Sequence, residues 1–195
     1  MEKSHFYVLI IYWFDFARLV NKDLLDEYFA ATLAQNHIKL ADDILEKINK
    51  NPYRIGLDLF EWGSNSDILN QAVILCFAHS LTNEDKYLNG AEQITDYIFG
   101  KNATGYSFLT GYGSKRVMFP HHRPSGADGI DDPVPGFIAG GPNKDRQDGY
   151  EVNYTSKLPA KSFMDVQESF ASNEDCLNWN APVVFVLGYL EQVRK

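Results

Sequence analysis

Apolar residues recur at intervals of three and four between residues 30 and 50, which predicts one buried face of an amphipathic helix. This face comprises Leu33, Ile38, Ala41, Ile44, Leu45 and Ile48. Pro52 follows closely, and because proline lacks a backbone N–H and clashes with the preceding turn, we expect the helix to end before it.

Three further helices are predicted by the same spacing. The first spans residues 66–81, with Ser66 as its N-cap. The second starts at Asn83, has its helical turns over residues 84–99 and stops at Gly100, where glycine can adopt the left-handed conformation. The last spans residues 183–193, with Pro182 in its first turn. We expect these helices to pack as antiparallel neighbours.

Between Lys101 and Ala171 the chain is rich in Gly, Pro, Asp and Asn and has no sustained periodicity, which indicates long loops. Loops of this length are either functional or disordered, and the aromatic residues within them favour packing over disorder. Short strands within this stretch remain possible, but no hairpin signal is present. The sequence therefore predicts an all-α fold with long ordered loops gathered at one end.

Composition narrows the possible partners. A chain of 195 residues with 45% hydrophobic residues can bury one core, so we expect a single domain. The net charge of -8 argues against nucleic acid, because that affinity depends on clustered Lys and Arg. Two cysteines, Cys76 and Cys176, provide neither a disulfide framework nor a zinc site. We expect neither a metal nor a cofactor, although the histidines at 121 and 122 leave zinc binding open as an alternative.

The N-terminal apolar stretch, residues 6–14, is too short to span a bilayer, so we expect no membrane segment there. We interpret it as a core helix. A signal peptide remains the alternative, since Lys3 precedes an apolar run of suitable length, although no small-residue cleavage site follows before Arg18. The compartment is left open.

Two stretches concentrate polar side chains suited to chemistry. The first, residues 107–125, places His121, His122 and Arg123 between two prolines that restrict the local backbone. Besides a role in chemistry, these residues could form a zinc site or belong to a purely structural loop. The second, residues 162–182, crowds carboxylates and amides at the entrance to an apolar helix. Its Glu174 is either a general acid or an ordinary residue at a helix start.

Both stretches resemble the two signatures of glycoside hydrolase family 9. The matching positions of the first are Ser107, Leu109, Thr110, Gly113, Lys115, Pro120, His121 and Arg123. Those of the second are Phe163, Asp165, Phe170, Glu174, Asn180 and Ala181, while Cys176 replaces the usual small residue. Between them, residues 132–143 resemble the PVPG and GGPN loop of the family. Upstream of the first signature, the segments at 51–53, 62–65 and 96–102 also resemble the family and occur in the expected order. The resemblance covers about residues 30 to 195, with residues 1–30 uncertain.

The resemblance implies part of an (α/α)6 barrel that hydrolyses β-1,4-glucosidic bonds in cellulose-like glucans with inversion. It assigns Glu174 as the general acid, and Asp165 as a supporting carboxylate that we expect to orient Arg123. His121 and Arg123 correspond to residues that bind sugar hydroxyls. Trp179 and Trp62 correspond to platforms for pyranose rings, with core packing as the alternative for Trp62. Members are usually secreted or periplasmic.

One family feature is not found. Inversion needs a second carboxylate about 6.5–9.5 Å from the acid. In the family this base lies in a DAGD-like motif early in the domain, and no such motif occurs here. Asp128, Asp131 and Asp132 lie in the wrong segment. The chain therefore resembles the C-terminal portion of the catalytic domain, and we expect it to be inactive alone.

The partners expected from this interpretation are a β-glucan oligosaccharide or polysaccharide, and either the missing N-terminal half or a second copy. Two other functions remain open. One is an exo-acting β-glucosaminidase of the same family. The other is a carbohydrate-binding remnant without catalysis.

Overall fold

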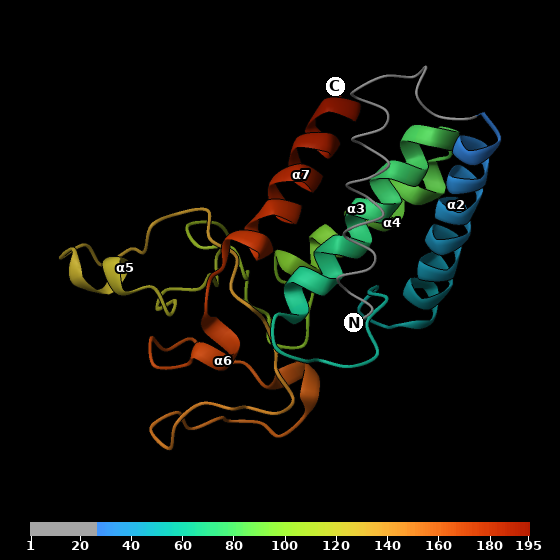
Figure 1. Ribbon diagram of the computed structural model, residues 1–195. Helices are drawn as coiled ribbons and strands as arrows, with labels where there is room; N and C mark the ends of the chain where they lie inside the picture. The colour runs from blue at the N-terminus through green and yellow to red at the C-terminus, as the bar shows by residue number, and fades with distance from the viewer. Residues whose placement is uncertain (1–26) are drawn as a thin grey trace.

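The computed structural model describes residues 27–195, which form helices joined by long loops (Figure 1). In chain order these are α2 (Glu27–Lys50), α3 (Ser64–Thr82), α4 (Asp85–Ile98), α5 (Arg123–Ala127), the 3-10 helix η2 (Pro159–Lys161), α6 (Phe170–Asn173) and α7 (Leu177–Val193). The described part of the chain has no strand beyond isolated bridges, so the all-α prediction is confirmed. The helix expected in residues 6–14 lies outside the described residues.

Helix α2 agrees with its prediction at the C-terminal end. Its buried face holds Ala41, Ile44 and Ile48 at the spacing that the sequence showed. The helix ends at Lys50, where the Asn51 N–H still donates to Lys47 O at 3.0 Å.

Helix α3 begins two residues before the expected cap, so the prediction of Ser66 as N-cap is wrong. The N-cap is Gly63, whose φ of 80° lies in the left-handed region that favours glycine. As a glycine, this residue provides no side-chain cap. Instead the Asn65 N–H donates to Gly140 O at 3.0 Å, and the Ser64 hydroxyl donates to Pro142 O at 2.7 Å. A loop distant in sequence thus satisfies the first turn.

A tight turn separates α3 from α4. Asn83, expected to start α4, instead ends α3 with a φ of 57°, and its N–H donates to His79 O at 2.7 Å. Glu84 is the N-cap of α4. At the other end Gly100 has a positive φ of 120°, as predicted for a glycine that follows a helix.

Helix α7 begins at Leu177, earlier than the predicted residue 183, and Pro182 therefore lies inside the helix instead of in its first turn. The N–H groups of Trp179 and Asn180 both donate to Cys176 O at 3.0 Å. The first turn is closed before the proline is reached, which is why the helix extends further than the proline suggested.

The long helices do not all pack antiparallel, which corrects that part of the prediction. The start of α3 at Gly63 lies against Trp179 near the start of α7, and His79 near the end of α3 contacts the Tyr189 hydroxyl at 2.7 Å. Helices α3 and α7 are therefore parallel neighbours. Figure 1 shows α2 and α4 running opposite to them.

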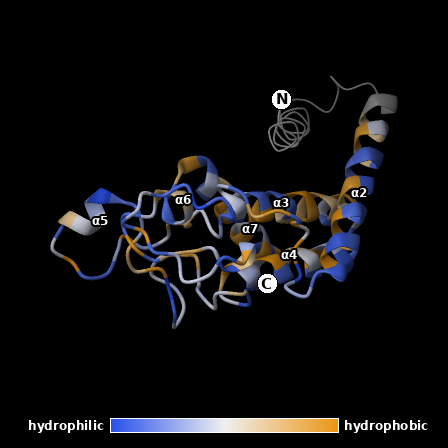
Figure 2. Cartoon of the chain, turned by 90° about the horizontal axis from the view of Figure 1, so that it is seen from below, coloured by the Kyte–Doolittle hydropathy of each residue, from blue (hydrophilic) through white to orange (hydrophobic). Residues whose placement is uncertain are grey.

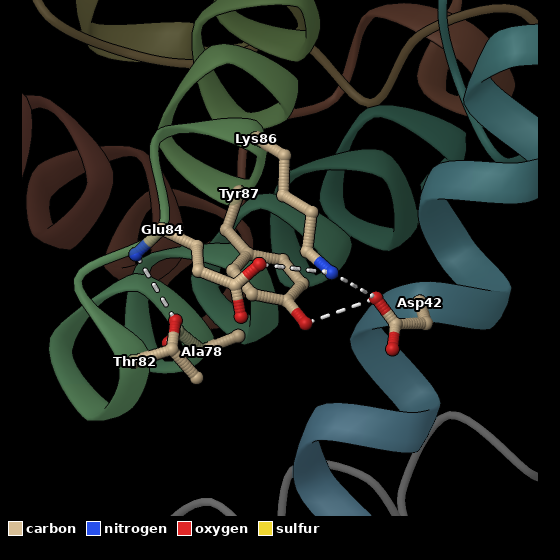
Figure 3. A network of polar contacts seen from close by, with 6 residues as sticks. All are labelled: Asp42, Ala78, Thr82, Glu84, Lys86 and Tyr87. Atoms are coloured by element: carbon tan, nitrogen blue, oxygen red, sulfur yellow. Dashed lines mark hydrogen bonds and ion pairs between the residues drawn. The ribbon is translucent and has the colours of Figure 1, made fainter.

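A polar network on the outer side joins α2 to α4 (Figure 3). Asp42 accepts from Lys86 Nζ at 3.0 Å and from the Tyr87 hydroxyl at 2.9 Å. Lys86 also pairs with Glu84 at 3.3 Å. Because Lys86 and both of its charged partners are substantially exposed, solvent screens these ion pairs, and they fix orientation more than stability.

The hydrophobic core is centred on α3, which is buried around most of its circumference by α2, α4 and α7. Figure 2 shows hydrophobic residues concentrated in the inner helices and hydrophilic residues along α2. None of the helices within residues 27–195 is long and apolar enough to cross a membrane.

Candidate active site

The loops between α4 and α7 are held in place by main-chain pairing with the helical core. The Phe108 N–H donates to Ile98 O, and the Ala139 N–H donates to Phe108 O, both at 2.9 Å. The Phe108 ring is fully buried and meets Phe163 edge-on at 5.0 Å between centroids. The predicted long ordered loops are therefore packed, and they lie together at one end of the helices (Figure 1).

Three loop segments converge on the main chain around Glu174. The His121 N–H donates to Asn173 O at 2.8 Å, and His121 and Glu174 form an isolated bridge. The Gly140 N–H donates to Glu174 O at 2.8 Å, and the Gly141 N–H donates to Ser172 O at 2.9 Å. The structure thus brings together the two stretches singled out in the sequence, although more than fifty residues separate their key side chains.

The carboxyl group of Glu174 is part-buried and forms no hydrogen bond or ion pair with any residue in the described range. The segment that carries it is rigid by contrast, since its neighbour Asn173 is fully buried and donates through Nδ2 to Phe119 O at 2.6 Å. A carboxyl that no described residue binds, on a backbone that is held in place, suits a group that acts on a ligand.

A hydrogen bond to the main chain orients the ring of His121. Its Nδ1 lies 2.5 Å from Gln167 O, and because a carbonyl only accepts, Nδ1 must carry the proton. In the neutral ring Nε2 is then the free acceptor. The ring also meets Phe170 at 6.1 Å between centroids.

His122 has the opposite role, because its Nδ1 accepts from the Ser125 N–H at 3.3 Å and caps α5. Its ring packs against Phe137 at 4.8 Å. The two adjacent histidines therefore have different hydrogen-bonding roles. Within residues 27–195 no group of three or more His, Cys, Asp or Glu side chains is arranged to hold a metal ion.

Arg123 is the first residue of α5, and its exposed guanidinium makes no ion pair within the described residues. Asp165, expected to orient it, has different partners. The Asp165 carboxylate accepts from the N–H groups of Met118 and Phe119 at 3.0 and 2.9 Å. These bonds support the backbone just before His121, and none of the hydrogen bonds of Asp165 in the described part of the chain goes to Arg123.

The two candidate platforms differ in environment. Trp179 is part-buried, and its indole lies so close to two glycines that an added Cβ would stand 2.9 Å from it at Gly140 and 3.0 Å at Gly63. Trp62 is 42% exposed, and its ring lies 5.6 Å from that of Phe170. Trp179 is therefore packed into the core more than Trp62 is. The sequence analysis had raised core packing as an alternative for Trp62 and not for Trp179.

Two further polar residues build the site, and only Asn143, the last residue of the loop at 132–143, lay in a stretch that the sequence had singled out. Asn143 is fully buried and donates through Nδ2 to Ala171 O at 2.8 Å. Asp148 accepts from the Ala171 N–H at 2.7 Å. Both hold the turn that precedes Glu174. A polar residue directly after the Gly-Gly-Pro run was the available clue for Asn143, because buried amides must find partners.

Comparison with known proteins identifies a matching family. The model for glycosyl hydrolase family 9 matches residues 4–187. A xyloglucan-specific endo-β-1,4-glucanase of Bacteroides ovatus is 40% identical over 187 residues, which cover 93% of this chain and 31% of that protein. A cellulose 1,4-β-cellobiosidase of Acetivibrio thermocellus is 37% identical over 173 residues, covering 82% of this chain and 19% of that protein. The chain thus spans about a third of the first relative's length and less of the second.

Solved structures agree in fold. AaCel9A in complex with a cellobiose-like isofagomine superposes with a TM-score of 0.77 at 33% identity, covering 86% of this chain and 33% of that one. A single mutant of a thermostable endoglucanase from Alicyclobacillus acidocaldarius gives a TM-score of 0.79 at 31% identity, covering 88% and 33%. These neighbours are (α/α)6 barrels, so the described helices form part of such a barrel.

Proposed function

This chain belongs to glycosyl hydrolase family 9, and from that premise we propose that it forms the acid-bearing part of an enzyme that hydrolyses β-1,4-glucosidic bonds in cellulose-like glucans. One observation carries the proposal. The His121 N–H bonded to Asn173 O at 2.8 Å holds the proposed sugar-binding loop directly beside Glu174, whose carboxyl has no hydrogen-bond partner within residues 27–195. Residues that act on one sugar must lie within reach of it.

Glu174 is the proposed general acid, which donates its proton to the departing glycosidic oxygen. Inversion requires a second carboxylate, about 6.5–9.5 Å away, to activate water. The acidic side chains in the nearby loop have other contacts, since Asp132 pairs with Arg116 at 2.6 Å and Asp128 accepts from the Ile130 N–H at 2.9 Å. We therefore place the base in the part of the family barrel that this chain does not match, and expect residues 1–195 alone to be inactive.

His121 and Arg123 are the proposed contacts to sugar hydroxyls. The free Nε2 of His121 can accept a hydroxyl proton, and the exposed guanidinium of Arg123 can only donate. The pair therefore offers both halves of the hydrogen bonding that a hydroxyl group needs. Asp165 contributes by fixing the backbone that leads into His121.

A second candidate function is carbohydrate binding by this chain without hydrolysis. The exposed Trp62 ring beside Phe170 favours it, since an open aromatic face can bury the apolar face of a pyranose. Such binding needs no second carboxylate, so it is available to residues 1–195 alone.

Activity is best tested in a fusion in which this chain replaces the aligned 187-residue region of the Bacteroides ovatus relative. Xyloglucan, a soluble cellulose derivative and chitosan oligomers serve as substrates. Glu174→Gln should lower glucan hydrolysis by about 10²–10⁴-fold while leaving oligosaccharide binding unchanged, because the amide keeps the shape but cannot donate an acid proton. Glu168→Gln, an exposed change in the same motif, is the matched control.

Four outcomes separate the alternatives. Full activity in the Glu174→Gln fusion contradicts the acid assignment, and rapid turnover by unfused residues 1–195 contradicts the placement of the base. Preferential cleavage of chitosan supports a glucosaminidase. If the chain binds cello-oligosaccharides without hydrolysing them, Trp62→Ala should abolish this binding in calorimetry, whereas Tyr150→Ala, which alters a fully exposed ring, should not.

A further inference from the structure

The turn that precedes Glu174 is capped by a side chain from a distant part of the sequence. Helix α6 is a single turn, Phe170–Asn173, and its N-cap Ser169 makes no side-chain cap bond. The N–H of Ala171 instead donates to Oδ1 of Asp148 at 2.7 Å, more than twenty residues earlier in the chain. A carboxylate at this end satisfies an otherwise unpaired donor and complements the positive end of the turn.

Asp148 is itself held by two hydroxyl groups. Its Oδ2 accepts from Tyr154 Oη and from Ser169 Oγ, both at 2.6 Å. Ser169 is fully buried, and its hydroxyl also lies 2.8 Å from that of Ser172. Both carboxylate oxygens are therefore occupied, and every one of these partners belongs to the turn or to the loop beneath it.

The α6 turn, held by Asp148, contacts residues on both sides of the candidate site. At its start the Phe170 ring contacts the rings of Trp62 and His121. At its end the carbonyls of Ser172 and Glu174 receive the N–H groups of the glycine loop. Burial, followed by the bond to Asp148, raises the pKa of Tyr154 to about 12, so this hydroxyl remains a donor across the working range of pH.

The geometry points to Asp148 as a positioning residue for Glu174, acting through the α6 turn and not through contact with the sugar. This inference rests on the proposed acid role of Glu174. Without the carboxylate, Ala171 loses its cap and two hydroxyl groups lose their acceptor. The turn would then sample orientations in which the acid no longer faces the glycosidic oxygen.

Hydrogen exchange on residues 1–195 tests the positioning independently of activity. In Asp148→Ala, amide exchange should accelerate at least about tenfold in residues 170–174 and at the His121 and Gly141 amides, while α3 and α4 stay protected. Asp145→Ala, which alters an exposed carboxylate paired with Lys144, should change none of these amides. An even loss of protection across α3 and α4 would show a merely structural role and overturn the inference.

If Asp148→Ala does not fold, Tyr154→Phe decides the question. It removes one donor to Asp148 and keeps the ring. Faster exchange confined to residues 170–174 is expected, and unchanged exchange there would contradict the proposal.

The fusion enzyme adds a readout that a structural defect would not produce. A dinitrophenyl leaving group departs without a proton, so Asp148→Ala should spare hydrolysis of dinitrophenyl β-cellobioside within about threefold while slowing cello-oligosaccharide hydrolysis by about tenfold or more. Equal losses on both substrates would overturn the inference. If the unmutated fusion hydrolyses neither, the proposed function fails, whereas the exchange measurement still reports on the anchoring.

Discussion

The helical region, formed by α2, α3, α4 and α7, and the loop region, residues 99–176, are ordered by different interactions. In the helical region, apolar side chains from the other three helices surround α3, which is buried around most of its circumference. In the loop region, polar side chains bond directly to the main chain. For example, Asn102 Nδ2 donates to the carbonyls of Tyr97 and Tyr106 at 2.7 and 2.8 Å.

This difference separates stability from positioning. Apolar burial is non-directional and scales with area, so it stabilises the helical region without defining where any single polar group points. Hydrogen bonds from buried amides and carboxylates are directional, and each fixes one segment of backbone. The candidate site lies in the loop region, which packs against the helical region.

The largest expected effect on stability comes from the helical region. Leu75→Ala empties space in the fully buried centre of α3, and the free energy of unfolding should fall by about 2–5 kcal/mol. Urea unfolding followed by circular dichroism measures the change. Leu59→Ala, at a side chain 59% exposed, is the control and should cost much less. Similar losses from both substitutions would remove the distinction between buried and exposed apolar residues.

A smaller loss is expected from a buried polar residue of the loop region. Asn143→Ala removes the bond to Ala171 O and the bond from the Asp145 N–H to Oδ1, and should cost about 1–3 kcal/mol. Hydrogen exchange should show the loosening in the loops and not in α3. Asn153→Ala, an exposed change nearby, should have no effect. Exchange that rises first in α3 would mean that the two regions are not separable.

Within the helical region, α7 carries an apolar stripe on its exposed face. Leu177 is 91% exposed and Val184 70% exposed, and Ala181 and Gly188 share their face of the helix. We expect this apolar stripe to cause self-association of residues 1–195. Val184→Lys should weaken it by about tenfold, equivalent to about 1.4 kcal/mol, in sedimentation velocity. Asn178→Lys adds the same charge elsewhere on α7, and an equal effect from it would implicate charge alone.

The smallest expected effect is a pH dependence in the packing of α2 against α3. Burial lowers the pKa of His37 from 6.5, partly offset by its hydrogen bond to Ile74 O. Because the unfolded chain binds the proton more readily, stability is fully present above pH 6.5 and is lost as the pH falls toward the folded-state pKa. Urea midpoints at pH 8 and pH 5 should differ less in His37→Phe than in the unmutated chain. An unchanged difference would assign the pH dependence to other groups.

The helices around residues 30–50, 66–81 and 84–99 could be predicted from the sequence, because periodic apolar spacing and nearby Pro, Gly and turn residues act locally. The family could also be predicted, because the two motifs retain their residue types and spacing. The general shape of residues 101–171 as packed loops followed from composition and aromatic content.

The partner that each polar group takes depends on the packing of the whole chain. The cap of α3 comes from the loop at Gly140, Asp165 supports Met118 and Phe119, and the α6 turn depends on Asp148. None of these contacts has a local signature, because each joins segments between 20 and 80 residues apart whose approach is set by the packing of the helices. Local patterns encode elements, whereas the direction of a buried hydrogen bond depends on where the whole chain has folded.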